Sequence, residues 1–139
     1  MDLGTHRGRR LRQRASDPAV LPGRRLRGLD GFDPYNFAGC SNQPWRSFSQ
    51  TLDTFYDWTA ANGLGSKPLL AQEFGTTYDP ADPAASTAWS AGIPAALAAH
   101  PRIKAVVRWD ADTACTLRID SGRGMVESFK SAGLAVPRP

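Results

Sequence analysis

The sequence predicts an α/β fold with parallel strands, and three observations support this prediction. After residue 29 one pattern recurs three times: a short apolar strand, a loop with polar and aromatic residues, and an amphipathic helix. This alternation is typical of βα units, whose strands pair in parallel. The segment before Glu73 is an unbroken apolar run, as expected of a strand buried on both faces. Glycine and proline residues mark the ends of the expected elements.

The first expected unit is a strand over Leu29–Asn36, a loop to Arg46 and a helix over residues 47–61. Asn62 and Gly63 supply a stop signal for this helix. The apolar face of the helix follows the helical spacing and comprises Phe48, Leu52, Phe55, Tyr56 and Thr59.

The second unit is a strand within Lys67–Gly75, a loop, and a helix with Asp82 as N-cap and Pro83 in its first turn. Pro94 lies inside this helical pattern and lacks a backbone donor, so we expect a kink or an early end there. The apolar positions of this helix are Trp89, Ile93 and Leu97.

The third unit is a strand over Ile103–Asp110, a loop containing Cys115, and a helix over residues 125–132 closed by Gly133. Strand alternation predicts which side chains share a face. With Glu73 on one face, the same face should carry Ala71 and Leu69, while Leu70 and Phe74 meet the helices. For the last strand, the face of Trp109 should carry Val107, Ala105 and Ile103, opposite Lys104, Arg108 and Asp110.

Three units are too few for a closed α/β barrel, which takes roughly 250 residues. The 139 residues therefore predict about three βα units of a larger ring, incomplete as they stand. Both outer strands of such a piece would lack a partner, which favours association or disorder.

Residues 1–29 form an arginine-rich leader with a different composition. Residues 1–30 contain eight arginines and three aspartates, a net charge of +5, without aromatic residues or apolar periodicity. Nucleic-acid binding is disfavoured because no aromatic residue is available to stack on bases. A secretion signal and a membrane span are disfavoured because no apolar core follows the charges. We expect this leader to be disordered or translated out of frame, and residues 30–136 to form the folded domain.

After the leader, the sequence resembles the C-terminal part of glycoside hydrolase family 26, the β-mannanase-like enzymes with an eight-stranded TIM (β/α)8 barrel. The resemblance covers about residues 29–133 and follows the order of the last three βα units. It rests on Gly31–Asn36, Lys67–Pro68, Gln72–Gly75, Trp89 and Ile103–Asp110.

This resemblance implies that Glu73 is the nucleophile of a retaining glycosidase. Such a residue attacks the anomeric carbon while a second carboxyl, about 5–5.5 Å away, protonates the leaving oxygen. Tyr35 is implied to donate a hydrogen bond to the nucleophile. Trp109 is implied to form an aromatic floor for the sugar, because sugar C–H faces are apolar. Further residues that could line subsites are Asp33, Asn36, Trp45, Asp110, Asp112 and Arg118.

The implied partner is a polysaccharide or oligosaccharide, β-mannan or a related β-glycan, and no cofactor, metal, nucleic acid or membrane is expected. No cluster of His, Cys and Asp residues has metal-ligand spacing. Cys40 and Cys115 follow the first and third strands and so lie at the same end of the sheet. If the parent enzyme is extracellular, a disulfide between them is expected. His100, at a helix end, is interpreted as a favourable C-terminal charge.

Two departures from the family pattern affect the expected function. The general acid/base belongs on the fourth strand, and no glutamate precedes Glu73. The chain alone is therefore expected to be inactive on polysaccharide. One codon assignment for Leu21–Arg27, read one base later, yields Phe-Pro-Gly-Asp-Asp-Tyr, a phrase typical of the family, which explains the leader as a frameshift. The alternative is a non-catalytic carbohydrate-binding or pseudoenzyme fragment that uses Trp109, Trp45 and Tyr35 as stacking surfaces without turnover.

Overall fold

The computed structural model describes residues 29–136, so the leader expected over residues 1–29 lies outside it except for Leu29. The domain is mixed α/β, with a small open parallel sheet and four α-helices. Its elements in chain order are β1 (Asp30–Phe32), β2 (Tyr35–Asn36), α1 (Phe48–Thr59), the π-helix η1 (Ala60–Leu64), β3 (Leu69–Thr76), α2 (Pro83–Ala91), α3 (Ile93–Ala99), β4 (Ile103–Arg108) and α4 (Met125–Ala135).

β3 is the central strand, and every other strand pairs with it in parallel. β1 pairs with its first half, β2 with its last two residues, and β4 runs along its other edge. The expected strand over Leu29–Asn36 is interrupted between Phe32 and Tyr35. Pro34 explains the interruption because it has no N–H to offer to a sheet ladder.

The helices begin at the residues that the sequence predicts. Ser47 caps α1, and its hydroxyl accepts from Gln50 N while the Gln50 side chain accepts from Ser47 N, which is a complete capping box. Asp82 caps α2 with Pro83 in the first turn. The single helix expected around Trp89 is divided into α2 and α3 at Gly92, and Pro94 lies in the first turn of α3, where its missing N–H does no harm.

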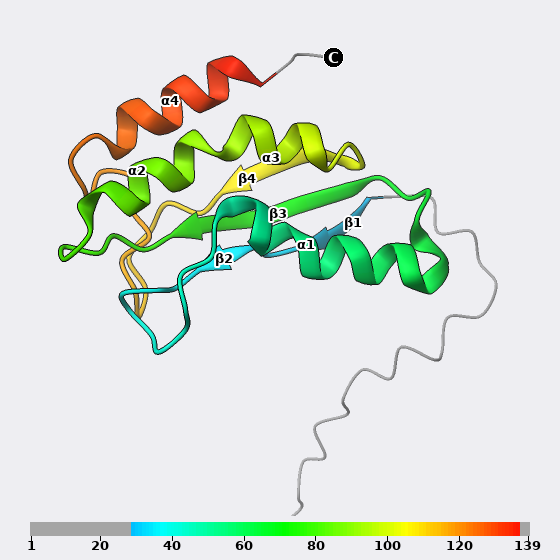
Figure 1. Ribbon diagram of the computed structural model, residues 1–139, viewed down its shortest axis with the longest axis horizontal. Coiled ribbons are helices and arrows are strands. Elements are labelled where there is room, and N and C mark those ends of the chain that lie inside the picture. The colour runs from blue at the N-terminus through cyan, green and yellow to red at the C-terminus, as the bar shows by residue number, and fades with distance from the viewer. Residues whose placement is uncertain (1–28, 137–139) are drawn as a thin grey trace, which may run out of the picture.

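The helices lie together over one face of the sheet (Figure 1). Their apolar sides and the facing side of the sheet form one hydrophobic core. It consists of Phe48, Leu52, Leu69, Phe74, Trp89, Ile93, Ala96, Ile103 and Ala132. Several aromatic rings meet in it, with ring centroids of Phe48 and Trp89 5.0 Å apart and those of Phe48 and Phe74 5.4 Å apart.

The predicted alternation of side chains along β3 and β4 was wrong for Leu69, Ala71 and Ile103. Leu69 and Ile103 lie in the core on the helix-covered side with Phe74, and Ala71, which is 0% exposed, lies on the same side rather than on the side of Glu73. The reason is that the β3–β4 pairing shifts register twice, between Leu69 and Leu70 and between Ala71 and Phe74. Each irregularity reverses the parity of the residues that follow.

α4 continues to Ala135, so the expected stop at Gly133 was wrong. Ala132 is buried in the core, and a Cβ added at Gly133 would meet no atom within 4 Å. Gly133 is therefore next to open space and does not end the helix. Packing of the neighbouring Ala132 in the core keeps the chain helical past it.

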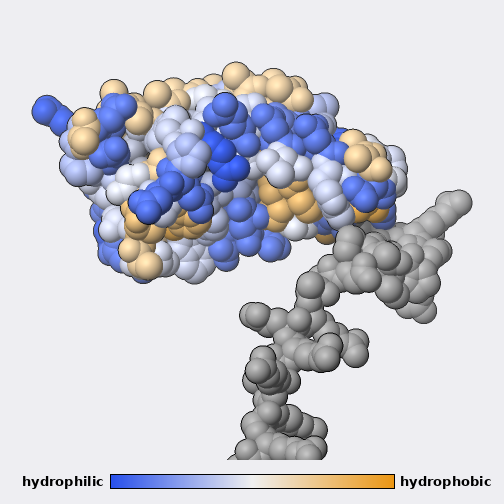
Figure 2. Space-filling model, turned by 60° about the horizontal axis from the view of Figure 1, so that its bottom comes forward, coloured by the Kyte–Doolittle hydropathy of each residue, from blue (hydrophilic) through white to orange (hydrophobic). Residues whose placement is uncertain are grey.

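The side of the molecule seen in Figure 2 is largely hydrophilic, with separate apolar patches. None of the helices within residues 29–136 combines the length and the apolar character needed to cross a bilayer.

Candidate active site

The carboxyl ends of β2 and β3 bring Tyr35 and Glu73 together. Tyr35 Oη donates a hydrogen bond of 2.8 Å to Glu73 Oε2, and the contact is partly buried. The two residues are 38 positions apart in the chain, so their contact depends on the parallel pairing of the strands. Within residues 29–136, Oε1 of Glu73 accepts no hydrogen bond.

Local structure explains why the two side chains meet. Tyr35 pairs with Gly75 across the sheet. A Cβ on Gly75 would lie 3.4 Å from Tyr35 Cε1 and 3.4 Å from Leu117 Cδ2, so the tyrosine ring and the Leu117 side chain pack directly over this glycine. On its other side the ring stacks on Phe37, with centroids 5.0 Å apart.

The β-bulge orients Glu73. Ala71 and Phe74 both face the helices, although they are an odd number of residues apart, because β3 carries an extra residue here relative to β4. Phe74 is in the core, and Glu73 precedes it in the strand, so Glu73 points to the side without helices. Bulges of this kind commonly re-aim a side chain beside a functional site.

The environment of Tyr35 keeps its hydroxyl protonated. Burial is the main cause that raises the pKa of Tyr35 above its ordinary value, followed by the hydrogen bond to Glu73 and the charges of Glu73 and Asp33. At neutral pH the phenol is therefore a hydrogen-bond donor to the carboxylate.

Trp109 lies just after β4, on the side of the sheet that faces away from the helices. Its backbone N–H donates to Phe74 O at 2.9 Å, which places it beside the Glu73 end of β3. The residue is 37% exposed, and Val107, two positions earlier, is 52% exposed. Arg108, between them, turns to the helix side, where its guanidinium lies over the rings of Phe74 and Phe129.

Other expected site residues have structural roles. Asn36 is 1% exposed, donates to Thr76 Oγ1 at 3.0 Å and accepts from Arg46 N at 3.3 Å. Its amide thus joins β2, β3 and the following loop, and we leave it out of the proposed site. Asp110 accepts from Ile119 N at 2.7 Å and so shapes the loop after β4.

Two further expected residues lie in exposed positions. Asp33 is exposed immediately before Pro34, close enough for its charge to raise the pKa of Tyr35. Trp45 is 39% exposed in the loop before α1. Of the remaining pair, Asp112 forms an isolated bridge with Thr116, and Arg118 binds Asp120 through two hydrogen bonds at the surface.

A disulfide joins Cys40 to Cys115, and it connects the loop after β2 to the loop after β4. Its Cα atoms are 5.7 Å apart, and 75 positions separate the two cysteines in sequence. Both loops follow the carboxyl ends of strands, so the disulfide holds together the segments that surround Tyr35 and Glu73.

Gln72 is a candidate that the sequence reasoning did not single out. It is exposed and precedes Glu73, and its side chain occupies the space where a Cβ of Gly31 would be. The sequence contained a signal for this residue, because Gln72 belongs to the Gln72–Gly75 motif. The direction in which its side chain points, however, depends on the β-bulge.

The part of the chain that the structure describes contains no group of three or more His, Cys, Asp or Glu residues able to hold a metal ion. In comparisons with known proteins, no family model matches this chain and no curated protein is significantly similar to it.

Proposed function

We propose that this domain is part of a retaining glycoside hydrolase of the β-mannanase type, in which Glu73 is the nucleophile. The hydrogen bond of 2.8 Å from Tyr35 to Glu73 Oε2 carries the proposal. It is formed where the carboxyl ends of adjacent parallel strands meet, the position of catalytic groups in α/β barrels. On this proposal β1 to β4 are the last strands of an eight-stranded barrel, with the uncovered face of the sheet toward the barrel axis.

The geometry suits the first half of a double displacement. Tyr35 holds Oε2, so Oε1 is available to attack the anomeric carbon. A bond then forms between Oε1 and that carbon while the bond to the leaving oxygen breaks, which gives a glycosyl-enzyme. Trp109, exposed on the adjacent strand end, supplies an apolar surface for the sugar ring.

The leaving oxygen of a natural glycan must take up a proton, normally from a second carboxyl group. The sequence contains two glutamates, Glu73 and Glu127, and Glu127 lies in the first turn of α4, in the helical layer. We therefore propose that this chain alone glycosylates Glu73 only when the leaving group needs no proton. The same observation favours the second candidate, a carbohydrate-binding fragment without turnover.

The disulfide between Cys40 and Cys115 supports an extracellular parent enzyme, since disulfides persist in oxidising compartments. The proposed substrate is β-mannan or a related β-glycan.

Covalent labelling tests the proposal. The purified chain would be incubated with a 2,4-dinitrophenyl 2-deoxy-2-fluoro-β-mannobioside, whose leaving group departs without protonation. We expect one fluoroglycosyl group per chain on the peptide that contains Glu73, detected by mass spectrometry. Tyr35→Phe should slow labelling by about 10-fold or more, since a positioning hydrogen bond is lost.

Glu127→Gln is the matched control and should be labelled like the wild type, whereas Glu73→Gln should not be labelled. Circular dichroism of each variant verifies that it folds. Saturable binding of mannohexaose without any label on Glu73 would favour the carbohydrate-binding alternative. Absence of both label and binding would reject both functions for this chain.

A further inference from the structure

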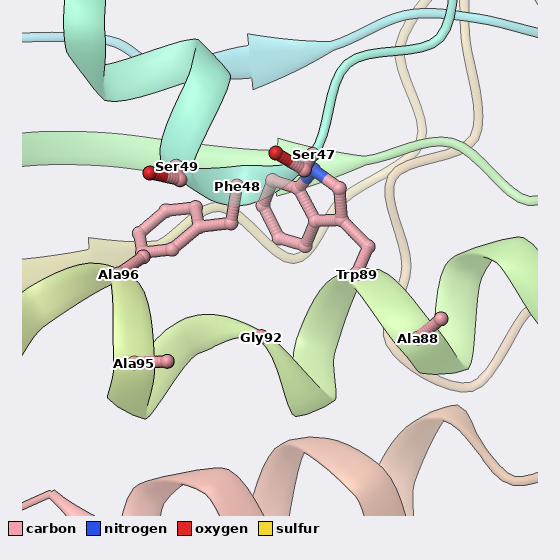
Figure 3. Close-up of a pocket in the computed structure, with 8 residues that line it drawn as sticks. All are labelled: Ser47, Phe48, Ser49, Ala88, Trp89, Gly92, Ala95 and Ala96. Atoms are coloured by element: carbon pink, nitrogen blue, oxygen red, sulfur yellow. The ribbon is translucent and has the colours of Figure 1, made fainter.

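The two sides of the sheet differ in how completely they are covered. On the helix-covered side a small cleft lies between the start of α1 and the junction of α2 and α3 (Figure 3), but the rings of Phe48 and Trp89 beside it are only 1% and 2% exposed. On the opposite side, Val107 and Trp109 are 52% and 37% exposed, and Gln72 is exposed as well. Parallel sheets are normally covered on both faces, so the uncovered face is the surface that calls for a partner.

The uncovered face is acidic at the end where the strands finish. Within residues 29–136, Glu73 forms no salt bridge and its Oε1 accepts no hydrogen bond. Asp33, between β1 and β2, adds a second negative charge close to Tyr35, whereas the guanidinium of Arg108 turns to the helix side. A partner that carries positive charge and some apolar surface would match this face.

The arginine-rich leader has both properties. Its residues 1–28 contain eight arginines and two aspartates, a net charge of +6, whereas residues 29–139 contain nine basic and eleven acidic residues, a net charge of −2. Leucine, valine and alanine residues lie between the arginines. A guanidinium group binds a carboxylate through two parallel hydrogen bonds and also stacks on aromatic rings, so arginine suits both Glu73 and Trp109.

The attachment point and the length of the leader allow it to reach this face. The leader joins the described chain at Leu29, directly before β1, whose Asp30 pairs with Leu69 of β3. Glu73 lies four positions further along β3, about 13 Å away at the usual rise of a strand. Arg24 is six positions before Asp30, and a chain of that length spans up to about 20 Å. The arginines near residue 24 can therefore reach Glu73 without any rearrangement of the described domain.

A second copy of the chain fits the uncovered face less well. Two copies related by a two-fold axis bring the same surface of each together. Glu73 of one copy would then face the acidic surface of the other, and like charges repel. The leader avoids this repulsion and, because it is tied to the domain, acts at a high effective concentration.

We propose that residues 21–27 of the leader dock on the uncovered face, where the Arg24–Arg25 pair binds the Glu73 carboxylate and covers Trp109. The contact masks Glu73 from molecules in solution. It needs only the charge of Glu73 and the exposed ring of Trp109, so it does not depend on the proposed glycosidase function.

Indole N–H signals in ¹H–¹⁵N spectra of the full chain test the proposal. Trp109 and Trp58 are both exposed, and their signals are assigned by single Trp→Phe substitutions. We expect the double variant Arg24→Gln, Arg25→Gln to shift the Trp109 signal, because the guanidinium groups no longer cover the ring. The signal of Trp58, which lies on α1 in the helical layer, should stay in place.

A matched control separates docking from a general effect of charge. The double variant Arg9→Gln, Arg10→Gln removes the same charge from a more distant part of the leader and should leave the Trp109 signal at its wild-type position. Addition of 1 M NaCl to the wild type screens exposed ion pairs and should move the Trp109 signal in the same direction as Arg24→Gln, Arg25→Gln.

Glu73→Gln shows whether the carboxylate is the partner of the arginines. In this background, Arg24→Gln, Arg25→Gln should shift the Trp109 signal by less than half as much as in the wild type, because the two sites are coupled through one contact. Light scattering of the wild type should give the mass of a single chain.

Three results would overturn the proposal. The first is a Trp109 signal that neither double variant moves, or that both move alike. The second is an effect of Arg24→Gln, Arg25→Gln that persists unchanged with Glu73→Gln. The third is a dimer that Arg24→Gln, Arg25→Gln leaves intact, which would assign the uncovered face to a second copy.

Discussion

The two faces of β3 differ sharply. On the helix-covered face, Leu69, Ala71 and Phe74 are 0%, 0% and 1% exposed. On the opposite face, Gln72 is exposed and Glu73 is partly buried, next to the exposed Trp109 of the neighbouring strand end. One short strand therefore stabilises the domain through one face and presents its candidate chemistry through the other.

The bulge between Ala71 and Phe74 makes this division possible. It keeps Phe74 in the core while placing both Gln72 and Glu73 on the uncovered side. A strand can therefore carry an acidic residue at its end and still pack in the core, provided that one extra residue changes which face of the sheet the following side chains occupy.

The strongest test of the comparison is Phe74→Ala against Gln72→Ala. Phe74 packs against Phe48, Trp89 and Phe129, so its truncation should lower the free energy of unfolding by about 3–5 kcal/mol. Gln72→Ala removes an exposed side chain and should change it by less than about 0.5 kcal/mol. Urea denaturation measures both, and equal losses would contradict the assignment of the two faces.

Removing the disulfide should have the next largest effect. The double variant Cys40→Ser, Cys115→Ser opens a loop of 75 positions and should lower the free energy of unfolding by about 2–4 kcal/mol. The wild type in excess reductant is the control and should reach the same stability. Unchanged stability in both samples would show that the loops around Glu73 are held by their other contacts.

Arg108 is a charged residue on the helix-covered face of the sheet, and its substitution tests how much its guanidinium contributes to stability. It donates from Nη2 to Leu117 O at 2.8 Å, but its Nε and Nη1 are buried without a partner within the described residues, and burial lowers its pKa. Arg108→Met keeps an apolar stem against Phe74 and should leave the free energy of unfolding within about 1 kcal/mol of the wild type or raise it.

Arg102 is the matched control for this substitution. It donates to Leu64 O, Tyr56 O and Thr59 Oγ1, so Arg102→Met should lower the free energy of unfolding by about 2 kcal/mol or more. If Arg108→Met proved as harmful as Arg102→Met, the Arg108 guanidinium would have a partner after all.

The smallest effect concerns the uncovered face and appears only at high pH. Because the pKa of Tyr35 is raised on folding, its contribution to stability is complete below the ordinary tyrosine pKa of about 10 and is lost as pH rises toward the folded value. Absorbance at 295 nm should show one of the three tyrosines resisting ionisation at pH 11 in the native chain.

Tyr35→Phe should remove this resistant group, while Tyr78→Phe should retain it. Urea midpoints between pH 9 and pH 11 should also fall more steeply for the wild type than for Tyr35→Phe. Titration of all tyrosines together in the folded wild type would contradict the buried contact with Glu73.

Much of the local structure was predictable from short-range signals. Ser47 and Asp82 marked helix starts because their side chains satisfy the first N–H groups of a helix, and the apolar run before Glu73 marked the central strand. Pro34 was a signal for the interruption between β1 and β2, but this interruption was not expected. The continuation of α4 past Gly133 was not predictable, since burial of Ala132 against other elements decides it.

Prediction of the candidate site from the sequence was limited in the same way, because its contacts join residues that are distant in the chain. The contact between Tyr35 and Glu73 was expected from a family resemblance, whereas periodicity alone suggested only that an acid ends a strand. The sequence predicted Trp89 as an apolar helix position, and it gave no sign that its Nε1 would be buried without a hydrogen-bond partner among residues 29–136. Asn36 looked like a substrate ligand, and only its bonds to Thr76 and Arg46 revealed a structural role.

By itself, the sequence determined where most helices begin and where the central strand lies, because apolar spacing, caps and breakers act over a few residues. Only the tertiary structure decided which face each strand residue occupies and which polar groups meet. Those outcomes depend on the register between strands that are distant in the chain, and a shift of one residue there exchanges the core side of a strand for its reactive side.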